Sequence, residues 1–230
     1  RLDEPFLVFV NLMEAHEPYY FGEPPLPPLA TKIKGTALGR LRQRSVLGRL
    51  TRGYRRSARS CVYAAAWIAR ALKERGLLQR TLFVFTSDHG QELMEHGALG
   101  HNSGHLYEEN IGIPIVVKPP ESLELAVSKC YVGLHELYDL ALSAASGEKT
   151  WSPSCGPSIA ESYDGVAPGP EAGKGVRRVA VFKSDKKATY RLDGSDSLVE
   201  EVVIAGRLLN PRSAEAKKAV EELSSHIITL

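Results

Sequence analysis

Three segments of the chain are almost continuously apolar and rich in β-branched or aromatic residues: residues 5–12, 81–87 and 111–117. Strands that are buried on both faces of a sheet show this pattern, whereas half-exposed strands alternate apolar and polar residues. A run of good helix formers, residues 57–76, precedes the second segment and ends at Gly76. The pattern predicts an α/β fold with a mainly parallel sheet and flanking helices.

The pattern changes after residue 120. Residues 121–146 predict one or two short helices, and residues 147–175 are rich in Gly, Pro and Ser, which is typical of a loop or linker. A small antiparallel sheet is predicted by residues 176–182, 187–192 and 198–204. An amphipathic helix with Ser213 as its N-cap closes the chain. We therefore expect an α/β domain over residues 1–146, a linker, and a small α+β region over residues 176–230.

Composition and charge narrow the class of protein. The 230 residues are 43% hydrophobic and 24% charged, which excludes a disordered or collagen-like chain, and no run of 18 apolar residues predicts a membrane span. Residues 24–73 contain twelve Lys or Arg and no Asp or Glu. This basic segment predicts either a solvated helical face that pairs with the acidic remainder or a surface for a polyanion, and it leaves a nucleic-acid partner open. The low content of Asn and Gln beside many Arg, Lys and Glu is a balance reported for proteins of hot environments.

The cysteine count bears on the cellular compartment, and the first residue bears on whether the natural N-terminus is present. Cys61, Cys130 and Cys155 are too few for a disulfide framework. We therefore expect a reducing compartment and a cytoplasmic location. The chain begins with Arg1, and we expect that its natural N-terminus is missing. The oligomeric state is left open.

Four of the seven histidines lie in residues 86–109, directly after a predicted strand. Ligands bind at the carboxyl ends of strands in open α/β sheets, so position and composition agree. Asp88 and His89 come first, and Gly90 allows a turn that brings a carboxylate oxygen and an imidazole nitrogen onto one cation. This pair suits Mn²⁺, Zn²⁺ or Mg²⁺, and less obviously Ca²⁺.

Three more histidines follow the metal-binding candidates: His96, His101 and His105. Imidazoles that titrate near neutral pH can hold an anionic ester or protonate a leaving oxygen. A simple zinc site formed by these three histidines is an alternative.

The segment TLFVFTSDHGQELMEHGALGHNSGHLYEENIGIPIVV resembles the metal-binding segment of sulfatases, which belong to the alkaline-phosphatase superfamily. The preceding ARALKERGLLQRT resembles the helix that leads into this strand, and FVNLMEAHEPYY resembles the H-x-P-Y segment of the family. The resemblance covers about residues 5–120. It implies an alkaline-phosphatase-like fold and the C-terminal part of a sulfatase catalytic domain.

The resemblance also implies roles for individual residues. Asp88 and His89 are implied as ligands of a divalent metal ion, with Mn, Ca, Mg or Zn left open. His16 and His101 are implied as catalytic residues that contact the oxygens of an anionic sulfate or phosphate ester, and His105 as a further substrate-binding residue. Three other residues are expected to shape the loop: His96, Tyr107 and Glu108.

The resemblance lacks two parts of the family's site: the nucleophile, and two further acidic metal ligands near the beginning of the domain. Sulfatases carry the nucleophile in a C-x-P-x-R-like motif before the H-x-P-Y segment, and none of the first fifteen residues reads as that motif. Cys155 in CGPSI follows the metal segment and has Ile159 in place of the Arg. We therefore expect an incomplete sulfate ester hydrolase that is inactive as this chain alone. A phosphodiesterase, phosphonate hydrolase or phosphotransferase of the same superfamily and a non-catalytic polyanion-binding member are the alternatives.

Overall fold

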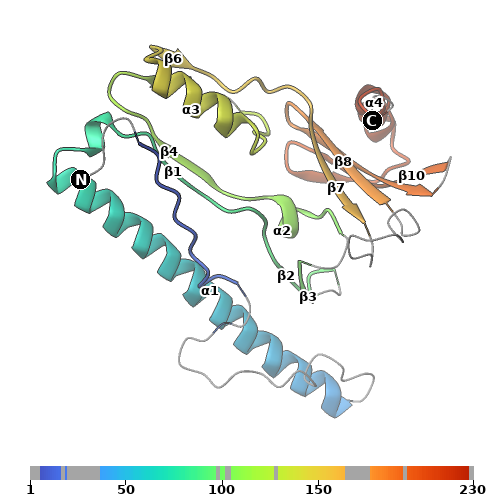
Figure 1. The fold of residues 1–230 in the computed structure, drawn as a ribbon. Coiled ribbons are helices and arrows are strands. Elements are labelled where there is room, and N and C mark those ends of the chain that lie inside the picture. Colours follow the sequence, from blue (N-terminus) through green and yellow to red (C-terminus); the bar gives the residue numbers. More distant parts are fainter. Residues whose placement is uncertain are drawn as a thin grey trace, which may run out of the picture. The chain divides into compact units, whose positions relative to one another are not determined.

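A computed structural model describes residues 6–16, 19, 37–96, 99–101, 105–126, 129–163, 177–193 and 196–227 of the chain (Figure 1). The protein has a mixed α/β structure and divides into two compact units. The first unit is made of Arg1–Gln79 and Glu92–Gly100, and the second of Arg80–Gln91 and His101–Leu230. None of the helices in the described part is long and apolar enough to cross a membrane.

The first unit contains the long helix α1 (Ala37–Glu74). The helix ends where the sequence predicts, because Gly76 adopts a left-handed conformation (φ 66°) and its N–H donates to the Lys73 carbonyl at 3.0 Å. It begins twenty residues earlier than predicted, since the Arg- and Leu-rich stretch before it also favours a helix. The side chains of Arg52, Arg55 and Arg59 are exposed on α1, which agrees with a solvated basic face.

The apolar segment 6–10 differs from the prediction of a strand. It forms no strand within the described residues, and its side chains are 50–90% exposed. A strand needs a neighbouring backbone edge for its N–H and C=O groups, and none of the described segments pairs with it. Further along, the Tyr19 ring lies 5.7 Å from the Tyr54 ring, so Tyr19 packs on α1. The unit also contains the antiparallel pair β2 (Glu92–Leu93) and β3 (Leu99–Gly100).

The boundary between the units falls within a short 3-10 turn, η2 (Leu78–Arg80), and the second unit begins at Arg80. Strand β1 (Phe83–Thr86) then pairs antiparallel with β4 (Ile115–Lys118), and a mainly parallel sheet is not found among the described strands. Between β1 and β4, the described residues form the antiparallel pair β2 and β3 and the four-residue helix α2 (Glu108–Ile111), and no long helix. Parallel neighbours need a crossover, usually a long helix, and without one the chain returns in the opposite direction.

A five-stranded antiparallel sheet forms the C-terminal part of the second unit, as the alternating segments predict. Its strands, in the order β11-β10-β9-β8-β7, are β7 (Ser158–Tyr163), β8 (Arg177–Lys183), β9 (Lys186–Asp193), β10 (Asp196–Ile204) and β11 (Arg207–Leu209). Helix α4 (Ala214–Ser224) packs on it, and the Ser213 hydroxyl accepts the predicted capping bond from the Ala216 N–H at 3.2 Å. The core between sheet and helix contains Val179, Val181, Ala188, Tyr190 and Leu223. Strand β7 lies in the segment that the sequence predicts as a loop or linker.

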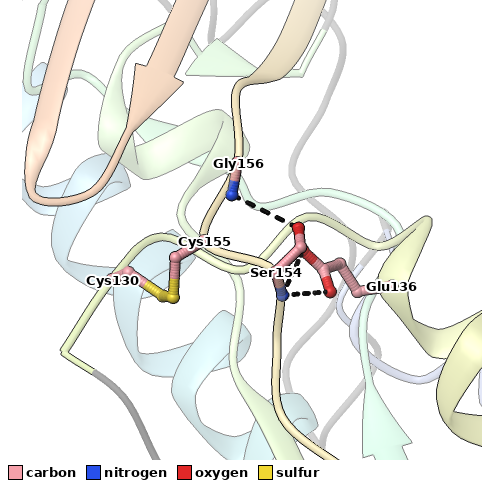
Figure 2. The surroundings of a disulfide bond; sticks show 5 residues. All are labelled: Cys130, Glu136, Ser154, Cys155 and Gly156. Atoms are coloured by element: carbon pink, nitrogen blue, oxygen red, sulfur yellow. Dashed lines mark hydrogen bonds between the residues drawn. A yellow bond between two sulfur atoms is a disulfide. The ribbon is translucent and has the colours of Figure 1, made fainter.

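Helix α3 (Glu136–Ser146) and the parallel pair β5 (Glu124–Leu125) and β6 (Thr150–Trp151) connect α2 and β4 to this sheet. A disulfide joins Cys130, before α3, to Cys155, before β7, with the two Cα atoms 5.7 Å apart (Figure 2). The cysteine count, which is too low for a disulfide framework, did not predict this single bond. The inference of a reducing compartment loses its basis, because disulfides persist in oxidising compartments.

A buried carboxylate supports the same loop. Glu136 at the start of α3 is 4% exposed, and its two oxygens accept hydrogen bonds from the Ser154 backbone N–H at 2.9 and 3.2 Å. The Ser154 hydroxyl donates to Glu136 at 2.5 Å and accepts from the Gly156 N–H at 3.2 Å (Figure 2). These bonds hold the chain around Cys155 against α3 independently of the disulfide.

Candidate functional site

Asp88 and His89 follow the end of β1 in the second unit. The Thr86 hydroxyl donates to the Pro114 carbonyl at 2.9 Å and ties the end of β1 to the segment before β4. The Ser87 hydroxyl donates to the His89 carbonyl at 2.6 Å, and the His89 backbone N–H donates to Oδ1 of Asp88 at 2.9 Å. These bonds close a tight turn in which Nε2 of His89 lies 3.7 Å from Oδ2 of Asp88.

The turn brings a second histidine into contact with the first. The His89 and His101 rings have their centroids 4.2 Å apart. Nδ1 of His89 lies 2.9 Å from the Gly90 carbonyl oxygen, and because a carbonyl only accepts, Nδ1 is the donor in this contact; in a neutral imidazole this tautomer leaves the lone pair on Nε2. Nδ1 of His101 lies 3.1 Å from Oε1 of Gln91, which orients that ring in the same manner.

The carboxylate of Asp88 is open to solvent, with 86% of its side chain exposed. Slight burial would raise the pKa of Asp88, but the hydrogen bond from the His89 N–H and the neighbouring imidazole outweigh it, so the pKa lies below its ordinary value. Asp88 is therefore ionised at neutral pH. An ionised oxygen donor thus stands next to an imidazole nitrogen, and a carboxylate and a neutral imidazole are the forms in which these groups bind metals.

These donors fit part of a divalent metal site. Two ligand atoms that each lie about 2.1 Å from one ion are at most roughly 4.2 Å apart, so the separation of the Asp88 oxygen and the His89 nitrogen is compatible with a shared ion. The bond from Nδ1 of His89 to a backbone carbonyl is the outer contact that metal-binding histidines usually make. No group of three or more His, Cys, Asp or Glu side chains surrounds a common point within the described ranges. Asp88 and His89 therefore fit as two members of a larger ligand set.

Helix α2 holds two parts of the histidine segment together. The Gly90 N–H donates to the Asn110 carbonyl at 2.6 Å, and a Cβ on Gly90 would lie 2.1 Å from the Glu109 carbonyl oxygen, so this approach requires glycine. The Asn110 side chain, 4% exposed, donates from Nδ2 to the His105 carbonyl at 3.2 Å. The His105 ring in turn packs edge-on against Tyr107, with centroids 5.0 Å apart. Asn110 thus positions the backbone on both sides of the site.

We expect Asn110→Ala to loosen this part of the site, because the His105 carbonyl loses its side-chain donor. A lost buried hydrogen bond costs about 1–3 kcal/mol, which corresponds to roughly 5- to 150-fold faster local amide exchange. The amides of residues 110 and 111, which donate to the Tyr107 carbonyl at 3.0 and 3.1 Å, report it by hydrogen exchange. The exposed control Glu121→Ala leaves their rates unchanged, and equal rates in the two variants would remove Asn110 from this role.

Two further histidines of the sequence analysis lie in the first unit. The His16 side chain is exposed in a turn that its own N–H closes on the Met13 carbonyl at 3.1 Å. His96 is exposed after β2. The contact of His16 with an ester and the contribution of His96 to the loop stay predictions.

The cysteines supply no activated thiol. Cys155, the resembling position in CGPSI, is bonded to Cys130 and has no thiol to react. Cys61 is buried on α1, and this burial, together with the Glu14 carboxylate, raises its pKa above the ordinary value. A nucleophilic cysteine needs a lowered pKa, so Cys61 is not suited to the role.

Two residues that shape the site were not singled out from the sequence, Gln91 and Asn110. Gln91 stands two residues after His89, so proximity was its only signal. Asn110 is the uncharged polar residue that follows the Glu pair at 108 and 109. A polar residue in a predicted buried turn is a signal of a backbone contact, but its partners are set by the tertiary structure.

Comparisons with known proteins place these residues in context. Residues 1–147 match the model of the Sulfatase family. Arylsulfatase K of Xenopus laevis is 38% identical over 78 residues, which cover 34% of this chain and 14% of that protein. Arylsulfatase K of Bos taurus is 37% identical over 76 residues, which cover 33% of this chain and 14% of that protein. The matched segment thus spans about one seventh of the length of either curated relative.

Proposed function

Since the chain belongs to the sulfatase family, we propose that the protein hydrolyses anionic sulfate esters and that Asp88 and His89 hold a divalent metal ion for this reaction. Family membership agrees with the resemblance of the three sequence motifs. The observation that carries the proposal is the turn after β1, in which Oδ2 of Asp88 and Nε2 of His89 lie 3.7 Å apart. The His101 ring lies against that of His89.

Asp88 and His89 would bind the metal ion as ligands of different charge. A bound divalent ion supplies positive charge that lowers the pKa of a nucleophile and neutralises ester oxygens. Asp88 contributes an anionic ligand, and His89 contributes a neutral ligand whose tautomer the Gly90 carbonyl selects. Oε1 of Gln91 lies 3.1 Å from Nδ1 of His101 and orients that ring beside His89.

The histidines also suit the charge that develops in the reaction. In-line attack on sulfur spreads negative charge over the equatorial oxygens, which imidazole N–H groups stabilise by hydrogen bonding. An imidazole can also protonate the departing alcohol oxygen, and general acid catalysis of this kind contributes roughly 10²- to 10⁴-fold. We assign these roles to His101 and His16, with His105 as a further contact to the ester.

A phosphodiester is the rival substrate. The ligand pair of one oxygen and one nitrogen suits transition metals as well as Mg²⁺, and a phosphate diester presents the same tetrahedral oxygens to the histidines. Charge and geometry of the described turn are compatible with both esters, so substrate assays must choose between them.

The test compares two chromogenic substrates, an aryl sulfate and an aryl phosphodiester, with the full-length natural protein. The protein is stripped with a chelator and supplied in turn with Mn²⁺, Ca²⁺, Mg²⁺ or Zn²⁺. We expect turnover of the aryl sulfate that disappears with chelation and returns with one of the ions. Preference for the phosphodiester would replace the sulfate ester by the rival. Absence of both activities in a folded, metal-loaded protein would overturn the proposal, and salt-sensitive heparin binding would then favour a polyanion-binding role.

A further inference from the structure

A lysine of the C-terminal sheet is completely buried. Lys187 lies on β9, and none of its side chain is exposed. Its Nζ lies 2.7 Å from Oε2 of Glu201 on β10 and 3.4 Å from Oε1 of Glu108 on α2. A buried ammonium group is stable only with such anionic neighbours. Lys187 therefore links the sheet to the helix that holds the candidate site.

The two carboxylates stand in different environments. Glu201 has 10% of its side chain exposed, belongs to the same sheet as Lys187, and also accepts from the Thr189 hydroxyl at 3.4 Å. Glu108 has 44% of its side chain exposed and comes from outside the sheet. Glu201 is sufficient to neutralise Lys187, so the approach of Glu108 adds a contact that the sheet itself does not need.

Other contacts join the C-terminal sheet to the segment that follows β5. The Tyr131 N–H donates to the Ser184 carbonyl at 2.8 Å, and the Tyr131 ring lies 4.9 Å from the ring of Phe182 on β8. Burial, together with the charges of Glu108, Glu201 and Asp185, raises the pKa of Tyr131 to about 12, so the phenol is neutral beside the carboxylates. The turn after β8 is thus packed against the segment that follows β5, which supports the position of Glu108 next to Lys187.

We propose that Lys187 is a positioning residue of the candidate site, acting through Glu108. Glu108 opens α2, and two residues later Asn110 holds Gly90 and His105. Lys187 lies outside the residues that match the family model. The C-terminal sheet is accordingly a working part of the site, because it fixes the helix on which the metal-binding turn rests. For its catalytic consequence, the inference rests on the proposed function.

The test uses three variants of the full-length protein. Lys187→Met removes the ammonium group. Glu108→Gln removes the carboxylate charge on α2 and leaves the pair of Lys187 and Glu201 intact, so it tests the inference even if Lys187→Met does not fold. Lys186→Met is the matched control, since Lys186 is the neighbouring lysine on β9 and pairs with Glu222 on α4 at 2.6 Å. Each variant is measured for exchange of the Gly90 amide, Mn²⁺ affinity by titration calorimetry, and kcat and KM for the aryl ester.

We expect Glu108→Gln to speed exchange of the Gly90 amide and to weaken Mn²⁺ binding about tenfold, because partners that orient metal ligands are worth 10- to 100-fold. Lys187→Met has the same effect or a larger one, and Lys186→Met has none. Unchanged Gly90 exchange and Mn²⁺ affinity in Glu108→Gln would overturn the inference, even if the variant melts at a lower temperature. Slower turnover with unchanged exchange would also overturn it.

The outcome is separable from that of the proposed function. Amide exchange and Mn²⁺ titration need no ester, so they report on positioning even if the wild-type protein hydrolyses neither substrate. Altered exchange and affinity in an inactive protein would retain the role of Lys187 and reject the hydrolase. If the wild type is active and Glu108→Gln changes neither exchange nor Mn²⁺ affinity, the hydrolase is retained and the role of Lys187 is rejected.

Discussion

Replacing Asp88 with alanine in the full-length protein is expected to remove the metal ion and to lower turnover of the sulfate ester by more than about 100-fold. Loss of groups that only orient a metal ligand already costs 10- to 100-fold, and Asp88 is the anionic ligand itself. The variant also removes the acceptor of the His89 N–H, which closes the turn at 2.9 Å. Elemental analysis after gel filtration reports the metal, and the aryl sulfate assay reports turnover.

Asp139→Ala is the control for this experiment, because Asp139 is an exposed aspartate on α3. We expect it to keep both metal and turnover. Full metal content in Asp88→Ala would refute the assignment of the ligand. Stoichiometric zinc in that variant would instead favour a site built from His96, His101 and His105.

The second large effect concerns the disulfide. Changing Cys130 and Cys155 to alanine is expected to lower the free energy of unfolding by about 3 kcal/mol, the loop-closure effect for a bridge of this span. The bridge has a sequence separation of 25 residues and joins the segment before α3 to the segment before β7, the first strand of the C-terminal sheet. Denaturant unfolding followed by circular dichroism measures the change.

A reducing agent provides the matching control. It should destabilise the wild-type protein by a similar amount and leave the Cys130→Ala/Cys155→Ala variant unaffected, since Cys61 is unpaired and buried. A peptide map of the non-reduced native protein should contain the bridged peptides. Alkylation of all three thiols without reductant would contradict the bridge. It would again favour a reducing compartment.

Local chemistry explains which elements were predictable. The end of α1 depends on Gly76, and the start of α4 depends on the Ser213 hydroxyl, which accepts from the Ala216 N–H three residues later. Both signals involve residues within a few positions of each other, so they operate in any tertiary context. The strands of the C-terminal sheet were predictable for the same reason, since alternation along a strand reflects one covered face.

The turn after β1 belongs to this predictable part. Asp88, His89 and Gly90 are adjacent, and their position after an apolar strand indicates an exposed end of a sheet. The pairing direction of β1 and β4 was not predictable from their composition, because continuous apolar runs describe burial and not the path of the chain between strands. The same limit applies to residues 6–10, where the apolar run is typical of a strand but none of the described segments supplies its partner.

The helix ends, the alternating strands and the donor types at Asp88 and His89 could be predicted, because each depends on neighbours in the chain. Only the tertiary structure decided that Cys130 meets Cys155, that Asn110 holds Gly90, and that Lys187 reaches Glu108 from 79 residues away. Such contacts join residues whose spacing carries no period or motif. They form because packing of the sheet, α2 and α3 excludes water and forces each buried polar group to find a partner.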